Sequence, residues 1–277
     1  MSQVLAGDIE AIVLHRIATA RRVFCFLDLD GMLASLTSTP DFFDPLRDTP
    51  ILLRQLALAP GTGVALLTGR RISELRRQFA VPNGYYVGVH SLEVSGSGRV
   101  VEISGEAAAV QSMMPAIERH LDDTLGARLG IVIEEKGIAQ AYHYRSATRV
   151  DRAATCTAVP AAGASFQRSG LPIDGTDRHA VVELLSIGVT KGIASCALLS
   201  MHALSTLPVY IGDHASDEDT FNALPAHAIT IRVGPPSRPT AASYRVNGPR
   251  GLLRLLYAVL RCRHAGANTP DLADWRN

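Results

Sequence analysis

The chain has 277 residues, 47% of them hydrophobic and 5% aromatic, and its formal net charge is +1. This length suits one large domain or two modest ones, and the near-neutral charge with few aromatic residues argues against a nucleic-acid-binding surface. The four cysteines are scattered without metal-ligand spacing, and Asp8 and Glu10 interrupt any signal-like apolar start. No apolar run approaches the roughly 18 residues of a membrane span, so we expect a cytoplasmic protein that binds neither nucleic acid nor a membrane.

The first part of the chain alternates helical and strand patterns. Residues 8–20 carry apolar side chains at helical spacing, and the unbroken apolar run 23–27 predicts a strand buried on both faces of a parallel sheet. The alternation continues with a helix over 50–59, a strand over 64–67, a helix over 72–79 and a strand over 85–89. This order of elements predicts an α/β fold in which helices flank a parallel sheet.

The pattern changes near residue 92 and resumes after residue 190. A turn-rich segment over 92–104 predicts a hairpin. Beyond it we expect a helix over 107–125, strands over 130–133, 139–145 and 180–184, and a polar helical stretch before the last strand. A helix over 192–203 and a buried strand over 209–211 then restore the first pattern.

The chain therefore predicts two domains. Residues 1–104 and 188–277 would form a discontinuous core, split by a smaller α+β domain over residues 105–187. The polar residues from about 264 onward are expected to fray.

Two carboxylates stand at the end of the first predicted strand. Side chains two residues apart in an extended segment point the same way, so Asp28 and Asp30 leave the strand on one side, with a turn at Gly31 behind them. In open parallel sheets, ligands bind beyond the carboxyl ends of the strands. Crowded carboxylates repel unless a cation or a shared proton relieves them, so a cation site is one interpretation and an acidic helix-capping turn is the other.

Three further signals stand where later strands end or helices begin. Thr68 follows the second buried strand, where a hydroxyl suits a phosphate oxygen, although an ordinary helix cap is the commoner explanation. Lys191 precedes a predicted helix and could neutralise a phosphoryl group or be a solvated surface charge. Asp213 follows a later strand directly and has no such ordinary explanation, whereas Asp217–Asp219 complement the dipole of a helix start.

Together these groups suit a phosphate ester and a hard cation. Mg²⁺ prefers oxygen ligands and commonly takes one or two carboxylates together with a substrate phosphate. One Asp can attack phosphorus to form an aspartyl-phosphate, while a second protonates the leaving oxygen and then activates water. A lysine and Mg²⁺ would offset the charge of the nucleophile and the phosphoryl group, so this set predicts phosphoryl transfer.

The order of the motifs resembles a known family. DLDG at 28–31, LLTGR at 66–70, KG at 191–192 and GDHASDED at 212–219 resemble the haloacid dehalogenase superfamily of phosphotransferases, in the class with an inserted α+β cap. More narrowly, residues 22–260 resemble the trehalose-6-phosphate phosphatases. The marks are GVH at 88–90 with Glu93, IEEKG at 133–137, HYR at 143–145, VEL at 182–184, YIGD at 210–213 and SDEDTF at 216–221. The resemblance implies a Rossmann-like parallel-sheet core of the haloacid dehalogenase type with that cap.

The resemblance also implies roles for residues of the core. Asp28 would be the nucleophile and Asp30 the general acid and base, with Mg²⁺ held by Asp28, the backbone carbonyl of Asp30 and Asp213. Thr68 and Lys191 would hold the phosphoryl group. Asp217 would support the metal or Lys191.

Substrate-binding positions are implied in both predicted domains: Thr68, Gly69, Arg70, Glu134, Lys136 and Glu183. The last three stand in the cap, where polar groups discriminate strongly among sugar hydroxyls and where closure would exclude water. Their alternative is a cross-strand salt bridge on the cap surface. His143 and Arg145 are expected to support the cap fold rather than to touch the substrate.

Three positions depart from the family pattern. Met32 stands where the first motif usually has Thr, which removes a hydroxyl near the phosphate and predicts a reduced rate. His214 replaces an Asp after the metal-binding Asp, which removes a negative charge and predicts weaker Mg²⁺ binding. Ser91 replaces a Gly after His90, which predicts an altered cap hinge or substrate approach.

The leading hypothesis is Mg²⁺-dependent hydrolysis of trehalose 6-phosphate to trehalose and phosphate, as a step of trehalose biosynthesis. The expected partner is a small-molecule sugar phosphate, and we expect a monomer. One alternative is a phosphatase of another sugar or glycosyl-glycerate phosphate. The other is a catalytically weak, sugar-phosphate-binding regulator, motivated by Met32 and His214. A third alternative is a scaffold without a ligand, in which the carboxylates would only form turns. The coincidence of five motif positions argues against it.

Overall fold

The computed structural model describes residues 2–35, 44–45, 48–91, 93–96, 99–101, 105–126, 129–136, 139–178, 181–187, 190–235 and 237–265. These residues form two compact units. The core unit draws on the chain up to Val101 and from Thr190 onward, and the insertion unit lies between Glu102 and Val189. Among the described helices, none is long and apolar enough to cross a membrane.

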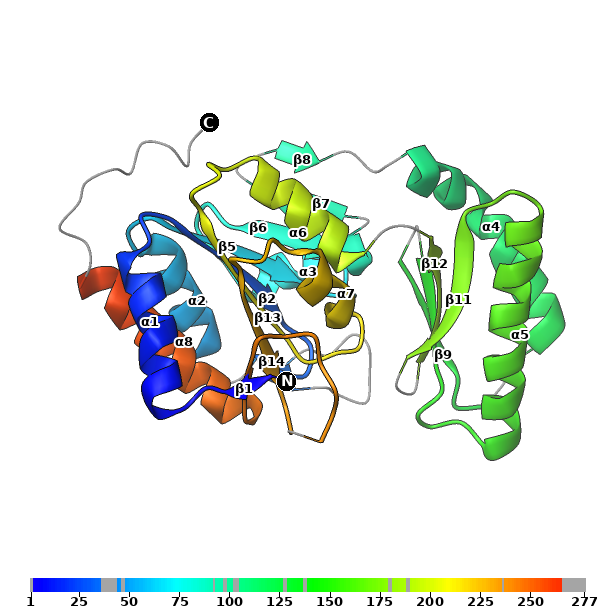
Figure 1. Cartoon of the computed structure of the whole chain (residues 1–277). Helices are drawn as coiled ribbons and strands as arrows, with labels where there is room; N and C mark the ends of the chain where they lie inside the picture. Colours follow the sequence, from blue (N-terminus) through cyan, green and yellow to red (C-terminus); the bar gives the residue numbers. More distant parts are fainter. Residues whose placement is uncertain are drawn as a thin grey trace. The chain divides into compact units, whose positions relative to one another are not determined.

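The core unit is built on one nine-stranded sheet (Figure 1). Its strands lie in the order β1 (Gln3–Val4), β15 (Tyr244–Val246), β14 (Ile229–Val233), β13 (Leu207–Gly212), β2 (Val23–Asp28), β5 (Thr62–Leu67), β6 (Tyr85–Gly88), β7 (Glu93–Gly96) and β8 (Arg99–Val101). All pairs from β1 to β6 are parallel, and the β7–β8 hairpin continues the sheet antiparallel. A separate short ladder joins β3 (Ala34–Ser35) and β4 (Asp44–Pro45). The predicted α/β fold with a parallel sheet is confirmed.

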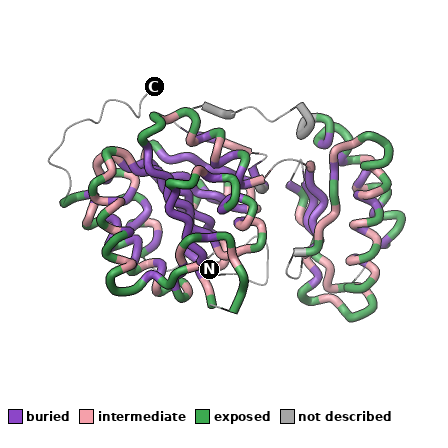
Figure 2. Tube along the Cα trace, in the orientation of Figure 1, coloured by how far each residue is buried: buried purple, intermediate pink, exposed green. Residues whose placement is uncertain are grey.

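Helices cover both faces of this sheet, because its central strands are apolar on both faces. In β2, Val23, Cys25 and Leu27 belong to a core cluster shared with α1, α2 and α8, whereas Phe24 and Phe26 belong to one shared with α6 and α7. Figure 2 shows these strands buried between helices whose outer surfaces are exposed. The described helices of the core unit are α1 (Gly7–Thr19), α2 (Thr49–Leu58), α3 (Ile72–Gln78), α6 (Lys191–Ser200), α7 (Asp217–Ala223) and α8 (Gly248–Ala265), with one 3₁₀ turn, η1 (Val89–Ser91).

The insertion unit is an antiparallel sheet with two helices. Its strand order is β11 (Ile173–Arg178), β12 (Val181–Ser186), β10 (Ala139–His143) and β9 (Val132–Glu135). The helices α4 (Gly105–Leu125) and α5 (Arg149–Arg168) share an apolar cluster with one face of the sheet, which includes Tyr142, Val182 and Leu184. The opposite face is free of that cluster and carries the polar side chains discussed below.

Several elements were not predicted. Strand β11 is polar and lies at the edge of its sheet, so its sequence lacks the apolar alternation of a half-buried strand. Strand β15 has only three residues. Strand β14 and helix α8 were also missed, although their sequences carry recognisable patterns. In α8, the buried residues Leu252, Leu255, Leu256 and Val259 repeat at helical spacing. Residues 97, 98, 137, 180 and 266–277, on which some predictions fell, lie outside the described residues.

The topology places the functional motifs together. Strand β2 lies between β5 and β13, and the chain leaves it toward β5 first and reaches β13 only after the insertion. Ligands of open parallel sheets bind where such a reversal occurs, at the carboxyl ends of the strands. Asp28 ends β2, Thr68 follows β5, and Asp213 follows β13, so three adjacent strands deliver their polar residues to one edge.

Candidate active site

Lys191 joins two buried carboxylates at the end of β2. Its ammonium lies 2.7 Å from Asp28 Oδ2 and 3.0 Å from Asp217 Oδ1. Lys191 is the first residue of α6, whose start is fixed because the Thr190 hydroxyl accepts a hydrogen bond from the Ile193 amide. All three charged residues are buried, so Lys191 is no solvated surface charge.

Burial and mutual attraction set the pKa values of this group. Burial raises the pKa of Asp28 to about 6, although the Lys191 ammonium opposes that shift. Burial also disfavours the Asp217 carboxylate, but Lys191 and the His214 amide together hold its pKa below the ordinary value. The two carboxylates raise the pKa of Lys191 against the effect of its burial. Near neutral pH the group therefore holds one positive charge between two carboxylates.

Asp30 is bound by two residues that follow the neighbouring strand β5. Its Oδ2 accepts the Thr68 hydroxyl at 2.5 Å, and its Oδ1 accepts Arg70 Nε at 2.8 Å. Burial would raise the pKa of Asp30, but Arg70 and Thr68 lower it below the ordinary value. Helix α3 begins only at Ile72, after Arg71 as its cap residue, so the explanation of Thr68 as a helix cap is wrong.

The turn that follows Asp30 depends on Gly31. Gly31 has φ of 80°, a conformation that residues with a Cβ rarely adopt. The Leu29 amide donates to Asp28 Oδ1 at 2.9 Å, which fixes the direction of that carboxylate and leaves Oδ2 facing Lys191.

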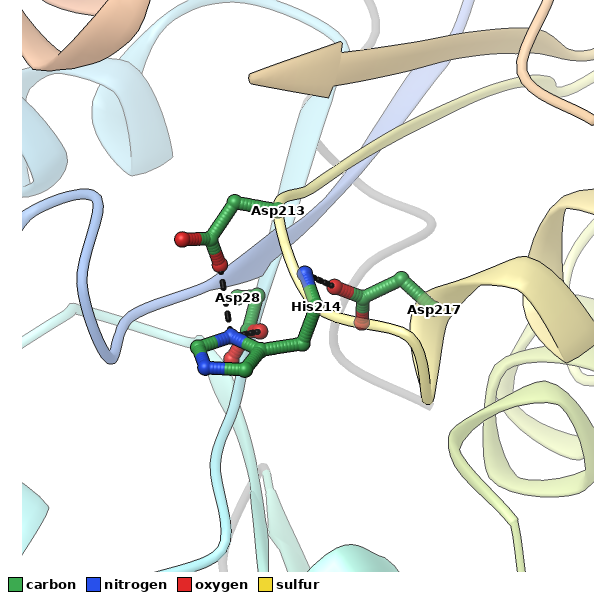
Figure 3. A group of neighbouring side chains, drawn as sticks. All are labelled: Asp28, Asp213, His214 and Asp217. Carbon is green, nitrogen blue, oxygen red and sulfur yellow. Dashed lines mark hydrogen bonds and ion pairs between the residues drawn. The ribbon is translucent and has the colours of Figure 1, made fainter. Parts of the chain in front are cut away.

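Asp213 and His214 complete the group at the end of β13 (Figure 3). His214 Nδ1 lies 2.7 Å from Asp213 Oδ1 and 3.6 Å from Asp28 Oδ2, and the His214 amide donates to Asp217 Oδ2 at 2.8 Å. Hydrogen bonds to Asp213 and Asp28 raise the pKa of His214 to about 10. The imidazole ring of His214 thus points toward the carboxylates of Asp28 and Asp213, while the backbone amide of His214 is bound to Asp217.

The donor set fits a hard divalent cation. Ligand atoms of Asp28, Asp213, His214 and Asp217 all lie within 4.8 Å of one another. Asp217 already accepts from Lys191, Tyr210 and the His214 amide, so its oxygens are committed to neighbours. Asp28 also pairs with Lys191 and accepts the Leu29 amide. The Asp213 carboxylate contacts only His214 among the described side chains. Because Asp28 and Asp213 stand at the ends of neighbouring strands, we expect these two carboxylates to take the cation.

The other two departures from the family pattern are Met32 and Ser91. The Met32 side chain is fully buried in the apolar core cluster of the core unit. Ser91 has φ of 95° and Val89 has φ of 46°, both in the region that favours glycine. A residue with a Cβ in this region carries a cost in backbone strain.

Three charged residues gather on one face of the insertion unit. Glu134, Ala141 and Glu183 are register partners in neighbouring strands, so Glu134 and Glu183 share a face. Lys136 Nζ lies 3.0 Å from Glu183 Oε1 and 3.6 Å from Glu134 Oε2, and His143 Nε2 lies 2.8 Å from Glu134 Oε2. We call Glu134, Lys136 and Glu183 the polar trio.

The geometry supports the cross-strand salt bridge that was the alternative for the polar trio, and its use in substrate binding stays a prediction. Lys136 and Glu183 are buried, so the pair is no solvated surface contact. His143 contacts Glu134 through a hydrogen bond and so supports the position of that carboxylate, whereas Arg145 is exposed.

Two supporting residues of the core site were not foreseen. The Tyr210 hydroxyl, within β13, donates to Asp217 Oδ1 at 2.8 Å. Arg232, within β14, donates to the Asp213 carbonyl at 2.9 Å and pairs with Glu218. A single charged residue inside the buried strand Ile229–Val233 was the available signal for Arg232.

Comparison with known proteins gives consistent results. A family model described as trehalose-phosphatase matches residues 26–250. The trehalose-phosphate phosphatase of Mycobacterium marinum is 30% identical over 239 residues, which cover 83% of this chain and 60% of that protein. The chain thus spans about 60% of the length of this curated relative.

Two solved structures show the same fold. The C-terminal domain of C. albicans trehalose-6-phosphate phosphatase matches with a TM-score of 0.79 at 19% identity, over 96% of this chain and 99% of that one. A haloacid dehalogenase-like hydrolase from Bacteroides thetaiotaomicron matches with a TM-score of 0.60 at 13% identity, over 87% and 99%.

The parallel core, the acidic group at its strand reversal and the antiparallel insertion define the haloacid dehalogenase class of fold. The family model covers most of the chain, from the residues of β2 through those of β15. The chain belongs to the trehalose-phosphatase family.

Proposed function

We propose that this protein is a Mg²⁺-dependent phosphatase that hydrolyses trehalose 6-phosphate to trehalose and inorganic phosphate. The single observation that carries the proposal is the ion group of Asp28, Lys191 and Asp217 at the strand reversal, with Asp30 and Asp213 beside it. The family match supports the choice of substrate.

Asp28 is the nucleophile of the proposed reaction. Its carboxylate attacks phosphorus, the bond between phosphorus and the sugar oxygen breaks, and an aspartyl-phosphate forms. Lys191 offsets the negative charge of the nucleophile and of the transferred group, and it holds Asp28 in place. Water then attacks phosphorus, inorganic phosphate leaves, and the Asp28 carboxylate is regenerated.

Asp30 moves the protons of both steps. It gives a proton to the departing sugar oxygen and later takes one from the attacking water. The Arg70 and Thr68 contacts favour the ionised form, which suits the second step. Protonation for the first step requires that the Arg70 contact at 2.8 Å loosen, so Arg70 sets how readily Asp30 acts as an acid.

The carboxylates of Asp28 and Asp213 and the backbone carbonyl of Asp30 would be the protein ligands of the cation. When bound, Mg²⁺ stabilises the charge that develops on the phosphoryl oxygens. The support for this part is the donor set of the core site, whose remaining carboxylate, Asp217, is already satisfied by Lys191 and Tyr210.

The polar trio is proposed to recognise the sugar. A buried Lys136 between two carboxylates presents both donors and acceptors, which sugar hydroxyls can match. Buried polar groups left unpaired by a wrong sugar are penalised, and this penalty gives discrimination.

The proposal is tested by phosphate release from a panel of sugar phosphates in the presence of Mg²⁺, with Asp28→Asn as the control. We expect a strong preference for trehalose 6-phosphate and loss of turnover in the control. Turnover of another sugar phosphate instead would contradict the proposed substrate but would be consistent with the proposed mechanism. Binding of sugar phosphate without turnover, unchanged in the control, would contradict the enzyme and favour a regulator.

A further inference from the structure

His214 lies where a ligand of the divalent ion is expected. Its Nδ1 faces Asp213 Oδ1 at 2.7 Å and Asp28 Oδ2 at 3.6 Å, the two carboxylates expected to hold the ion (Figure 3). Its backbone cannot turn away freely, since the His214 amide donates to the buried Asp217.

The spacing fits shared coordination. Neighbouring ligands on an octahedral ion about 2.1 Å away lie about 3 Å apart. The distances of Nδ1 to the two carboxylate oxygens lie on either side of that value. A nitrogen atom therefore stands at a ligand distance from two oxygen donors, without any rearrangement of the backbone.

Other groups hold two of the carboxylates around the imidazole and the backbone of the third residue. Lys191 pairs with Asp28 and Asp217, and Arg232 holds the backbone carbonyl of Asp213. The imidazole is hydrogen-bonded to the Asp213 carboxylate, so the ion would bind Nδ1 in place of the proton that this nitrogen shares with Asp213.

We propose that His214 donates its Nδ1 to the divalent ion and shifts the preference of the site from Mg²⁺ toward Mn²⁺. Mg²⁺ prefers oxygen donors, whereas imidazole nitrogen suits transition metals, whose affinities exceed that of Mg²⁺ at such sites. This inference rests on the metal site of the proposed function and adds to it the identity of the ion.

The ligand atom can be observed directly. Mn²⁺-loaded protein is examined by pulsed electron paramagnetic resonance, in which a coordinated imidazole gives a ¹⁴N modulation. The variants are His214→Asp, which restores an oxygen donor, and His227→Asp, which makes the same change at an exposed histidine. Calorimetric titration of each protein with Mn²⁺ and with Mg²⁺ gives the preference.

We expect ¹⁴N modulation in the natural protein and in His227→Asp, and none in His214→Asp. The ratio of Mn²⁺ to Mg²⁺ affinity should fall about tenfold in His214→Asp. Bound Mn²⁺ without ¹⁴N modulation, or an unchanged ratio, would overturn the inference. The spectrum of the natural protein decides the question even if a variant fails to fold.

The outcome is separable from that of the proposed function. Metal binding is measured without substrate, so an oxygen-only Mn²⁺ site beside normal phosphate release contradicts the inference alone. Absence of any divalent-ion binding overturns the inference, and metal-stimulated phosphate release then decides separately whether the proposed function also fails.

Discussion

At the scale of single residues, the balance of buried charge decides the behaviour of the core site. Asp28, Lys191 and Asp217 are buried together, and the Lys191 charge favours the ionised form of both carboxylates, as they favour the ionised form of Lys191. Removing one partner of a buried pair leaves an uncompensated charge, which costs more than the pair itself contributes. The consequence is testable on Asp217, because the same helix turn offers an exposed carboxylate for comparison.

Asp217→Asn should lower the free energy of unfolding by about 2–4 kcal/mol, because Lys191 loses a charged partner in a buried place. Asp219→Asn removes a carboxylate from the same first turn of α7, where the side chain is exposed, and should change it by less than about 0.5 kcal/mol. Urea denaturation measures both. Equal effects would show that the helix dipole, not the ion pair, gives Asp217 its importance.

His202 gives a residue-scale prediction about pH. Its ring lies 4.7 Å from that of Phe24, and burial, together with the Arg22 charge, lowers its pKa. The unfolded chain therefore binds a proton more readily, so stability is lost as pH falls below about 6.5. His202→Phe keeps the ring and removes the titration.

The loss of stability between about pH 8 and about pH 5.5, measured by urea denaturation, should be smaller in His202→Phe than in the natural protein. His227→Phe, at an exposed position, serves as the control and should leave the loss unchanged. An equal loss of stability in all three proteins would show that groups other than His202 cause the loss at low pH.

At the scale of elements, the 3₁₀ turn η1 concentrates backbone strain. Both of its end residues, Val89 and Ser91, have positive φ, and the Val89 amide is tied to the Arg70 carbonyl at 2.9 Å. A residue with a Cβ in this region costs of order 1–3 kcal/mol. The cost is borne beside Arg70, the partner of the proposed acid and base.

Ser91→Gly should raise the free energy of unfolding by about 1 kcal/mol, since Gly adopts φ of 95° without strain. Ser91→Ala removes the hydroxyl and keeps the Cβ, so it controls for the hydroxyl and should give no comparable gain. Thermal unfolding separates the two. A gain as large in Ser91→Ala would locate the cost in the buried hydroxyl and not in the backbone.

Besides its buried apolar side chains, helix α8 carries an arginine that hydrogen-bonds to the rest of the core unit. Arg263 donates to the backbone carbonyls of Ile17, Ala20, Arg21, Pro60 and Gly61 and to the Thr62 hydroxyl. These groups lie at the end of α1 and before β5, at the amino ends of the central strands. Gly61 is required there, because a Cβ would lie 2.5 Å from the Arg21 carbonyl oxygen.

Arg263→Lys should lower the free energy of unfolding by about 2 kcal/mol or more, because an ammonium keeps the charge and cannot reach most of these acceptors. Arg261→Lys, at an exposed position of the same helix, should change it by less than about 0.5 kcal/mol. Chemical denaturation measures the difference. Similar losses of unfolding free energy in the two variants would show that the hydrogen bonds of Arg263 do not stabilise the protein.

Sequence reasoning reached the central elements because their signals are local. The run 23–27 was apolar on both faces, and polar residues followed three strands that proved to be neighbours. The edge strand β11 escaped because its pairing, rather than its own side chains, makes it a strand. The contact of Arg70 with Asp30 and of His214 with Asp28 joins segments far apart in the chain, which no spacing could reveal.

At the scale of the whole molecule, the two units carry different parts of the proposed reaction. The core unit carries the ion group, and the insertion unit carries the polar trio, which faces away from its own apolar cluster. Chemistry and specificity should therefore be separable by substitution, since each depends on a different unit.

The measurement that tests this division most directly compares kcat/KM for trehalose 6-phosphate and for p-nitrophenyl phosphate in the natural protein, Glu183→Gln and Asp28→Asn. We predict that Glu183→Gln lowers kcat/KM for the sugar ester about 100-fold and that for the aryl ester less than about threefold. Asp28→Asn should abolish both activities. An equal loss on both esters in Glu183→Gln, or turnover that persists in Asp28→Asn, would contradict the account.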